Sequence, residues 1–245
     1  MLLYLIRHGK PDYETDTLLP EGLKQAELVS ERLVKSGLDE IYSSPMGRAR
    51  ETAAPTAEKL GLPVTVLPWA YELQGDTHTV IEGTSRSLSW VDPRIYMREP
   101  WRSLPEEGFF SHPAVKEYPA VPGGFEKRYR MISEGLDELL LEHGYRRTPE
   151  GFYLPERPND LHLGLFCHNA MMRVMISHLM NIPYQYLCCP IIGNFTGITV
   201  FSFQERAGQE GESIVPYLLS YGDVGHIYTD EEALPFTNYS TGKPY

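Results

Sequence analysis

The sequence has little cysteine and no long apolar run. Its three cysteines are Cys167, Cys188 and Cys189, which are too few for a disulfide framework and do not form the CxxC spacing of a zinc site. No stretch reaches the roughly 18 apolar residues that a membrane-spanning helix needs. We therefore expect a protein of a reducing compartment, the cytoplasm, with no metal site and no membrane partner.

Positive charge is also in deficit. The chain has 22 Lys and Arg against 33 Asp and Glu, which gives a formal net charge of −11. Nucleic-acid backbones require clustered cations, so no nucleic-acid partner is expected. A small phosphorylated substrate stays compatible with this balance. A few arginines in a cleft can dominate the local potential while the remaining surface is screened within about 10 Å.

The remaining composition is that of an ordinary globular chain, with 245 residues and 42% hydrophobic residues. We predict one domain over 1–245, in which strands alternate with helices as in an α/β fold with a largely parallel sheet. Proline at position 55 should kink or restart the second helix. The predicted helices are Pro20–Lys35, Met46–Leu60, Phe125–Glu142 and Ala170–Met180. The predicted strands are Leu2–Ile6, Asp39–Tyr42, Leu62–Leu67, Leu161–Cys167, Thr196–Phe203 and Ile214–Tyr221, with a hairpin over Tyr145–Leu154.

Regular periodicity is missing from about Asp76 to Gly124, a segment rich in proline that contains Trp90 and Trp101. A structureless loop of that length is unusual, and such segments are often functional. We predict that the insertion 76–124 consists of short helices and irregular loops and forms a lid over the active site.

Two predicted strands end in a histidine, in the runs Leu5-Ile6-Arg7-His8-Gly9 and Leu165-Phe166-Cys167-His168-Asn169. Ligands of open α/β sheets bind beyond the carboxyl ends of the strands, so parallel neighbours bring both imidazoles to one cleft. Gly9 is expected to let the backbone approach a ligand closely. Asn169 is expected to cap a helix whose free N–H groups offer an anion site beside His168.

Two further residues add to this site. Arg48 lies at a predicted helix start, within Ser43-Ser44-Pro45-Met46-Gly47-Arg48-Ala49-Arg50-Glu51-Thr52-Ala53. Its guanidinium can form paired hydrogen bonds with phosphate oxygens. Glu72 stands among aromatic and apolar neighbours, where a carboxyl group can keep its proton near neutral pH, as a general acid requires.

These motifs resemble the histidine phosphatase superfamily, which has the phosphoglycerate-mutase-like fold. The RHG triplet at 7–9, followed by SSPxxRAxxTA at 43–53, carries the resemblance, which continues at Glu72, His168, Asn194 and His226. It implies a three-layer α/β/α fold with a mostly parallel central sheet, and a phosphomonoester hydrolase that needs neither metal nor cofactor.

The resemblance also implies residue roles. His8 attacks phosphorus and becomes a phosphohistidine, and Glu72 protonates the leaving oxygen and then activates water. Arg7, Arg48 and His168 hold the phosphoryl oxygens, with Asn169 in the substrate-binding set. We expect one ring nitrogen of His8 to donate to a backbone carbonyl, which selects the tautomer that can attack.

Two alternatives remain open. A cofactor-dependent phosphoglycerate mutase returns the phosphoryl group to substrate instead of water. It is disfavoured by Gly123-Gly124-Phe125-Glu126, which stands where such mutases have Gly-Glu-Ser. Pro11 and Glu14 stand where many members of the family have Thr and Asn, so the phosphate contacts of those two residues are not expected here. An inactive relative that binds a phosphorylated ligand or a protein is the alternative outside enzymes. The sequence leaves open the substrate, the oligomeric state and the roles of His226 and Asn194.

Overall fold

The computed structural model describes residues 1–73, 78–81, 84–87, 98–113, 124–188, 191, 193–205 and 211–228. Its centre is a six-stranded sheet of order β12-β11-β1-β10-β4-β5. Strands β1, β10, β4 and β5 are parallel neighbours, and β11 runs antiparallel to both β1 and β12, so the predicted mostly parallel sheet is confirmed. The strands are β1 (Leu2–Arg7), β4 (Glu40–Ser43), β5 (Val64–Val66), β10 (His162–Cys167), β11 (Ile198–Ser202) and β12 (Tyr217–Asp223).

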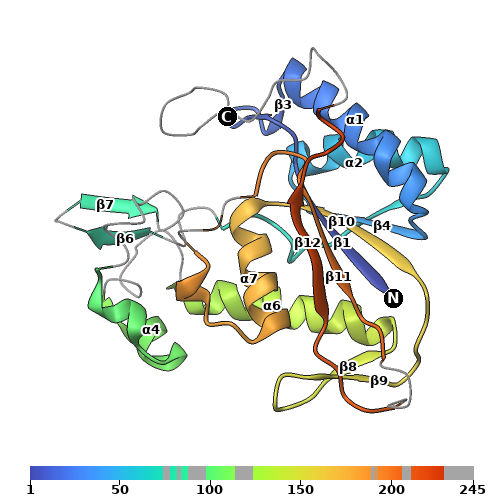
Figure 1. Cartoon of the computed structure of the whole chain (residues 1–245). Helices are drawn as coiled ribbons and strands as arrows, with labels where there is room; N and C mark the ends of the chain where they lie inside the picture. Colours follow the sequence, from blue (N-terminus) through green and yellow to red (C-terminus); the bar gives the residue numbers. More distant parts are fainter. Residues whose placement is uncertain are drawn as a thin grey trace.

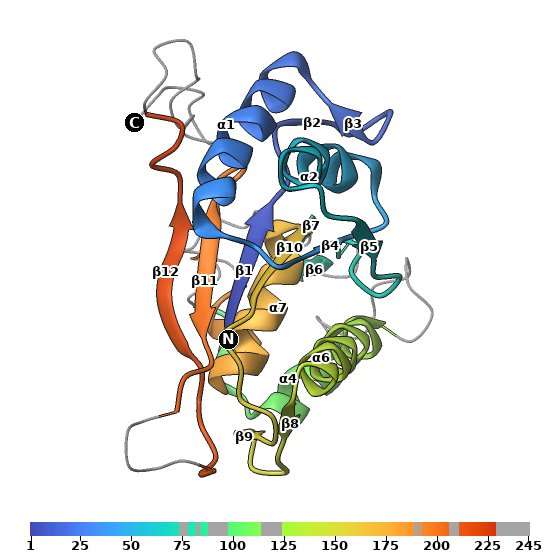
Figure 2. The ribbon, with the colours of Figure 1, turned by 90° about the vertical axis from the view of Figure 1, so that its right-hand side faces the viewer.

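Helices cover both faces of the sheet. Helices α1 (Pro20–Ser36) and α2 (Gly47–Leu60) pack together on one face, and α6 (Gly124–Glu142) and α7 (Asn169–Met180) lie on the other (Figures 1 and 2). None of the helices in the described ranges is long and apolar enough to cross a membrane. The helices on the two faces of the sheet give the three-layer α/β/α arrangement that the resemblance implies.

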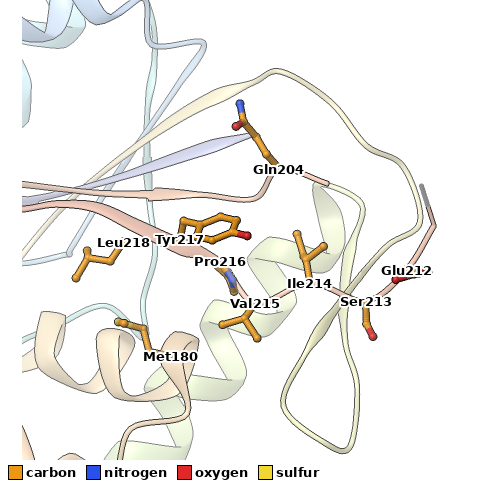
Figure 3. A pocket seen from close by; sticks show the side chains of 9 residues that line it. All are labelled: Met180, Gln204, Glu212, Ser213, Ile214, Val215, Pro216, Tyr217 and Leu218. Carbon is orange, nitrogen blue, oxygen red and sulfur yellow. The ribbon is translucent and has the colours of Figure 1, made fainter. Parts of the chain in front are cut away.

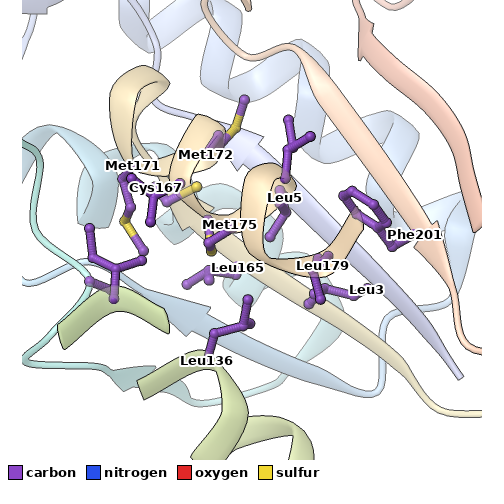
Figure 4. Packing of buried hydrophobic residues seen from close by; sticks show 14 of the residues in the cluster. Leu3, Leu5, Leu136, Leu165, Cys167, Met171, Met172, Met175, Leu179 and Phe201 are labelled. Atoms are coloured by element: carbon purple, nitrogen blue, oxygen red, sulfur yellow. The ribbon is translucent and has the colours of Figure 1, made fainter. Parts of the chain in front are cut away.

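Strand alternation divides the core into two clusters. Ile6 and Phe166 pack with residues of α1 and α2, whereas Leu5, Leu165 and Cys167 belong to the cluster on the α6 and α7 side. Figure 4 shows this second cluster, in which α7 contributes several methionines. Burying side chains of this size contributes about 1.5–3 kcal/mol each. This packing fixes the positions at which β1 and β10 end.

The structure corrects two predicted helix details. Helix α2 continues through Pro55, so it does not restart there; Ala53 and Ala57 on either side of the proline are both packed in the core, and a kink at Pro55 stays a prediction. Helix α7 begins at Asn169 with His168 as its N-cap, so Asn169 is the first helical residue and not the cap.

The smaller elements lie outside the central sheet. Hairpins are formed by β2 (Pro11–Asp12) with β3 (Thr17–Leu18) and by β8 (Tyr145–Arg147) with β9 (Tyr153–Pro155), the latter as predicted; η3 (Tyr184–Tyr186) follows α7. The predicted insertion 76–124 contains the short helices η2 (Pro100–Ser103) and α4 (Glu106–Ser111), as expected. It also contains the antiparallel strands β6 (His78–Ile81) and β7 (Thr84–Ser87), which the prediction of short helices and irregular loops missed. Residues 76–77, 82–83, 88–97 and 114–123 of the insertion, Trp90 among them, lie outside the described residues, so the lid stays a prediction.

Candidate active site

The ends of β1 and β10 bring the two predicted histidines together. The strands pair in parallel with Arg7 opposite Cys167, so the next residues, His8 and His168, leave the sheet side by side. Their ring centroids are 5.2 Å apart, and both side chains are almost fully buried. The predicted convergence of the imidazoles at one sheet edge is confirmed.

The tautomer of His8 follows from its hydrogen bond. Its Nδ1 lies 2.7 Å from the carbonyl oxygen of Gly9, and because a carbonyl only accepts, Nδ1 must carry the proton. Nε2 then has a free lone pair, as expected. Burial, followed by the charges of Arg7 and Arg48, holds the pKa of His8 well below its usual 6.5. The ring is therefore neutral at physiological pH.

Gly9 is held by a residue whose role sequence reasoning missed. The Gly9 N–H donates to Oγ1 of Thr52 (2.9 Å), and the same hydroxyl donates to the Arg48 carbonyl (2.7 Å). A Cβ at Gly9 would lie 2.6 Å from the carbonyl oxygen of Gly22, so glycine is required here for close packing against α1. Close approach of a ligand to the Gly9 backbone stays a prediction. The available signal was the spacing of Thr52, one helical turn after Arg48.

Arg7 is fixed by the loop before β11. Its Nη1 donates to the Gly193 carbonyl, and its guanidinium carbon lies 4.2 Å from the ring centroid of Phe195. The N–H of Thr196 in the same loop donates to the His8 carbonyl (3.3 Å). One short loop therefore positions both residues of the Arg-His pair.

Arg48 reaches the site from the start of α2 and is 3% exposed. Its guanidinium pairs with the carboxylate of Asp16 and contacts Sδ of Met46 (3.4 Å), while its Nε has no hydrogen-bond partner in the described part of the chain. The other oxygen of Asp16 accepts from the N–H of Gly47 (2.7 Å). Asp16 was not predicted, because it comes from the distant β2–β3 turn.

His168 has one ring nitrogen engaged. Its Nε2 lies 2.7 Å from Oγ of Ser44, whereas Nδ1 has no hydrogen-bond partner among the residues that the structure describes. Burial first, then the charges of His8, Arg48 and Arg7, hold the pKa of His168 well below its usual 6.5. His168 is therefore also neutral, with Nδ1 as its remaining polar atom.

Glu72 occupies the position where an external anion was expected. Its Oε1 accepts from the N–H of Met171 (3.0 Å) and its Oε2 from that of Ala170 (3.3 Å), so the chain's own carboxyl group satisfies the first turn of α7. The prediction of an open helix-terminus anion site is wrong. Asn169 does not cap the helix either, since its Oδ1 accepts from the Gly193 N–H (2.9 Å).

The two residues left open by the sequence lie behind the site. His226 is 7% exposed, and its Nε2 is 3.0 Å from Oγ1 of Thr196, the residue that bonds the His8 carbonyl. Burial, then Arg32, lowers the pKa of His226 to about 4 against the opposing effect of Asp223. Asn194 closes the same loop, because its carbonyl accepts from the Gly197 N–H (3.0 Å).

One cavity of the described residues lies apart from this site. A cavity of about 650 Å³ is lined by Met180, Gln204 and residues 212–218, and it includes none of the predicted site residues (Figure 3). Within the described ranges, no group of three or more His, Cys, Asp or Glu side chains is arranged to hold a metal ion.

Comparison with known proteins agrees with this geometry. The sequence model of the histidine phosphatase superfamily (branch 1) matches residues 3–86. The chain is 35% identical over 151 residues to the probable phosphoglycerate mutase GpmB of Yersinia pestis (strain Pestoides F), an alignment that covers 55% of this chain and 69% of that protein. The chain belongs to the histidine phosphatase superfamily.

Solved structures show that this superfamily member shares its fold with phosphatases. It matches the mycobacterial glucosyl-3-phosphoglycerate phosphatase with a TM-score of 0.57 and 20% identity, over 91% of this chain and 99% of the other. It matches phosphoserine phosphatase from Entamoeba histolytica, solved with 3-phosphoglyceric acid, with a TM-score of 0.54 and 22% identity, over 92% and 98% of the two chains. The fold implied by the sequence motifs is confirmed.

Proposed function

We propose that this histidine phosphatase superfamily member is a phosphomonoester hydrolase that acts on a small phosphorylated substrate through a phosphohistidine at His8. The observation that carries the proposal is the buried cluster of two neutral imidazoles and two guanidiniums at the end of β1 and β10. Opposite charges held in a dry site stabilise a phosphoryl group in the transition state without reorganisation.

The first step begins at His8. Its Nε2 lone pair attacks phosphorus and forms the N–P bond while the bond from phosphorus to the ester oxygen breaks. Glu72 gives its proton to the leaving oxygen, which departs as an alcohol. In the second step water attacks phosphorus, Glu72 takes the water proton, and the N–P electron pair returns to His8 as inorganic phosphate is released.

The other site residues bind the phosphoryl group. Arg7 and Arg48 offset its charge, and the free Nδ1 of His168 supplies a hydrogen bond. Asn169 supports the position of Arg7 through Gly193, because its side chain holds the loop whose carbonyl accepts from Arg7. The place of Asn169 in the substrate-binding set stays a prediction. The Glu72 carboxyl group bonds the amides two and three residues after His168, which supports its place in this proposed site.

The substrate class, lid and location belong to the same proposal. Two matched structures are of phosphatases whose names contain phosphoglycerate or phosphoserine, which supports a small phosphorylated metabolite. We propose that the insertion 76–124 of the single domain 1–245 closes over this ligand. The buried free thiol of Cys167 supports a reducing, cytoplasmic setting.

Phosphoglycerate mutase activity is the second candidate, favoured by the 35% identity to a protein of that name. Both candidates pass through a phosphorylated His8, and they differ in what accepts the phosphoryl group. Incubation with a phosphoglycerate separates them. Isomerisation without phosphate release supports the mutase, and release of inorganic phosphate supports the hydrolase.

The main experiment screens phosphorylated metabolites in the presence of EDTA and measures phosphate release. We expect turnover that survives chelation, an acid-labile phosphoprotein during turnover, and loss of both in His8→Ala. His162→Ala is the matched control, because His162 lies at the opposite end of β10 and bonds the Ser36 carbonyl. Unchanged activity in His8→Ala contradicts the mechanism, and activity abolished by EDTA contradicts its independence of metal. Phosphate binding without any turnover supports the inactive relative.

A further inference from the structure

One buried arginine of α6 forms hydrogen bonds with the backbone of the segment that carries Glu72. Arg128 is 2% exposed, and its two Nη atoms donate to the backbone carbonyl of Trp69 at 3.3 and 3.2 Å. Nη2 also donates to the Tyr71 carbonyl, and the guanidinium carbon lies 3.2 Å from the Tyr71 ring centroid. A single side chain therefore binds two of the three residues that immediately precede Glu72.

A second contact holds the same segment on the same helix. A Cβ at Gly135 would lie 2.5 Å from the indole ring of Trp69, so the ring packs directly on the helix backbone. Positions 128 and 135 are two turns apart and share one face of α6. Residues 69–72 pack against this face of α6, which contacts them through Arg128 and Gly135.

The opposite side of the segment faces the phosphate-binding residues. The Glu72 N–H contacts Sδ of Met46 (3.3 Å), and the same sulfur contacts the Arg48 guanidinium. The carboxyl group itself bonds the first turn of α7. Glu72 is thus clamped between α6 on one side and the α2 and α7 starts on the other.

Packing alone does not account for an arginine at this position. Removing a guanidinium from water is costly, and an apolar side chain of similar volume usually fills a buried site at no loss of stability. An arginine is useful here because the several N–H donors of its planar guanidinium hold the carbonyls of Trp69 and Tyr71 in one fixed geometry. Because the guanidinium of Arg128 bonds the backbone just before Glu72, the geometry that it fixes is the position of Glu72.

We propose that Arg128 is a positioning residue for the proton transfer by Glu72, acting through the backbone of Trp69 and Tyr71. This inference rests on the proposed hydrolase function. A displacement of about 1 Å in a catalytic group can lower the rate about 100-fold. Loss of Arg128 therefore slows the steps in which Glu72 moves a proton more than the other steps, on which Arg128 acts only through its charge near His168.

The leaving group of the substrate separates this role from a general loss of structure. A nitrophenolate departs without a proton, whereas an alkyl alcohol such as glycerol needs one from the acid. For Arg128→Met we expect kcat/KM for glycerol phosphate to fall about 10- to 100-fold and that for p-nitrophenyl phosphate to fall less than about threefold. Glu72→Gln should show the same selectivity, more strongly.

Three further variants complete the test. Arg173→Met removes another fully buried arginine, which donates to the Cys188 carbonyl, and should lower the two rates in equal proportion if it changes them at all. Arg128→Lys keeps the charge with fewer donors and should show a smaller selective loss. It also replaces Arg128→Met if circular dichroism shows that variant to be unfolded. In the Glu72→Gln background, Arg128→Met should cause no further selective loss.

The outcomes separate the inference from the proposed function. If the Arg128 variants lower both rates equally, or change neither, the positioning role is wrong while the hydrolase mechanism stands. If Glu72→Gln itself shows no dependence on the leaving group, the assignment of Glu72 as the acid fails first.

Discussion

The hydroxyl of Thr52 offers a sharp test of how α2 supports the nucleophile. Thr52 is fully buried, and its Oγ1 accepts from the Gly9 N–H at 2.9 Å. Thr52→Val keeps the shape and the β-branched character but removes the acceptor. The Gly9 N–H is then buried without a partner, and the Gly9 carbonyl that orients His8 is less firmly held.

The expected magnitude follows from these contacts. A buried donor left unsatisfied costs about 1–3 kcal/mol. In a chain of this size each kcal/mol shifts Tm by about 2–4 °C, so Thr52→Val should lower Tm by about 2–12 °C. Displacement of the Gly9 carbonyl should also lower kcat by about tenfold or more, because small errors in the position of a nucleophile are costly.

Thr56 supplies the matched control. It lies one turn later on α2 and is equally buried, but its hydroxyl has no hydrogen-bond partner in the described residues. Thr56→Val should therefore leave activity unchanged and keep or raise Tm. The assay is thermal unfolding followed by phosphatase kinetics on each variant. Equal Tm and equal kcat for wild type and Thr52→Val refute the reasoning.

Further predictions concern pH and packing. The folded-state pKa of His226 is lowered to about 4 from 6.5, so the unfolded chain binds the proton more readily, and stability is lost as pH falls from 6.5 to about 4. His226→Gln should reduce this loss of unfolding free energy by on the order of 3 kcal/mol, measured by urea titrations across this pH range. An unchanged dependence of the unfolding free energy on pH contradicts this role of His226. Because the pKa of His8 lies well below 6.5, kcat/KM should show no loss from His8 protonation between about pH 7.5 and 6.5. Gly135→Ala should displace the Trp69 ring and lower the free energy of unfolding by about 1–3 kcal/mol in denaturant melts, whereas unchanged stability would show that the ring moves freely.

The fold was largely accessible from local patterns. Apolar runs that stop at Arg7 and Cys167 indicated two buried strands, and their parallel pairing placed His8 beside His168. The motif that contains Arg48 lay at a helix start as predicted. These inferences succeeded because hydrophobic periodicity and the direction of parallel strands are local properties of the chain.

Local sequence patterns did not predict the hydrogen-bond and ion-pair partners of the site residues. The Asp16 carboxylate on Arg48 and the Arg128 guanidinium behind Glu72 come from a turn and a helix with no motif of their own. Helix α7 showed the same limit, because its first amides found their acceptor in Glu72, about a hundred residues earlier in the chain.

What the sequence determined by itself was therefore the order of strands and helices and the set of groups that can handle a phosphoryl group. What only the tertiary structure decided was which groups already have partners. The Glu72 carboxyl group and the Asn169 amide are bonded inside the protein, while Nδ1 of His168 keeps its bonding capacity. The physical reason is that a buried polar atom bonds whatever donor or acceptor the packing brings within about 3 Å, and no local pattern encodes that neighbour.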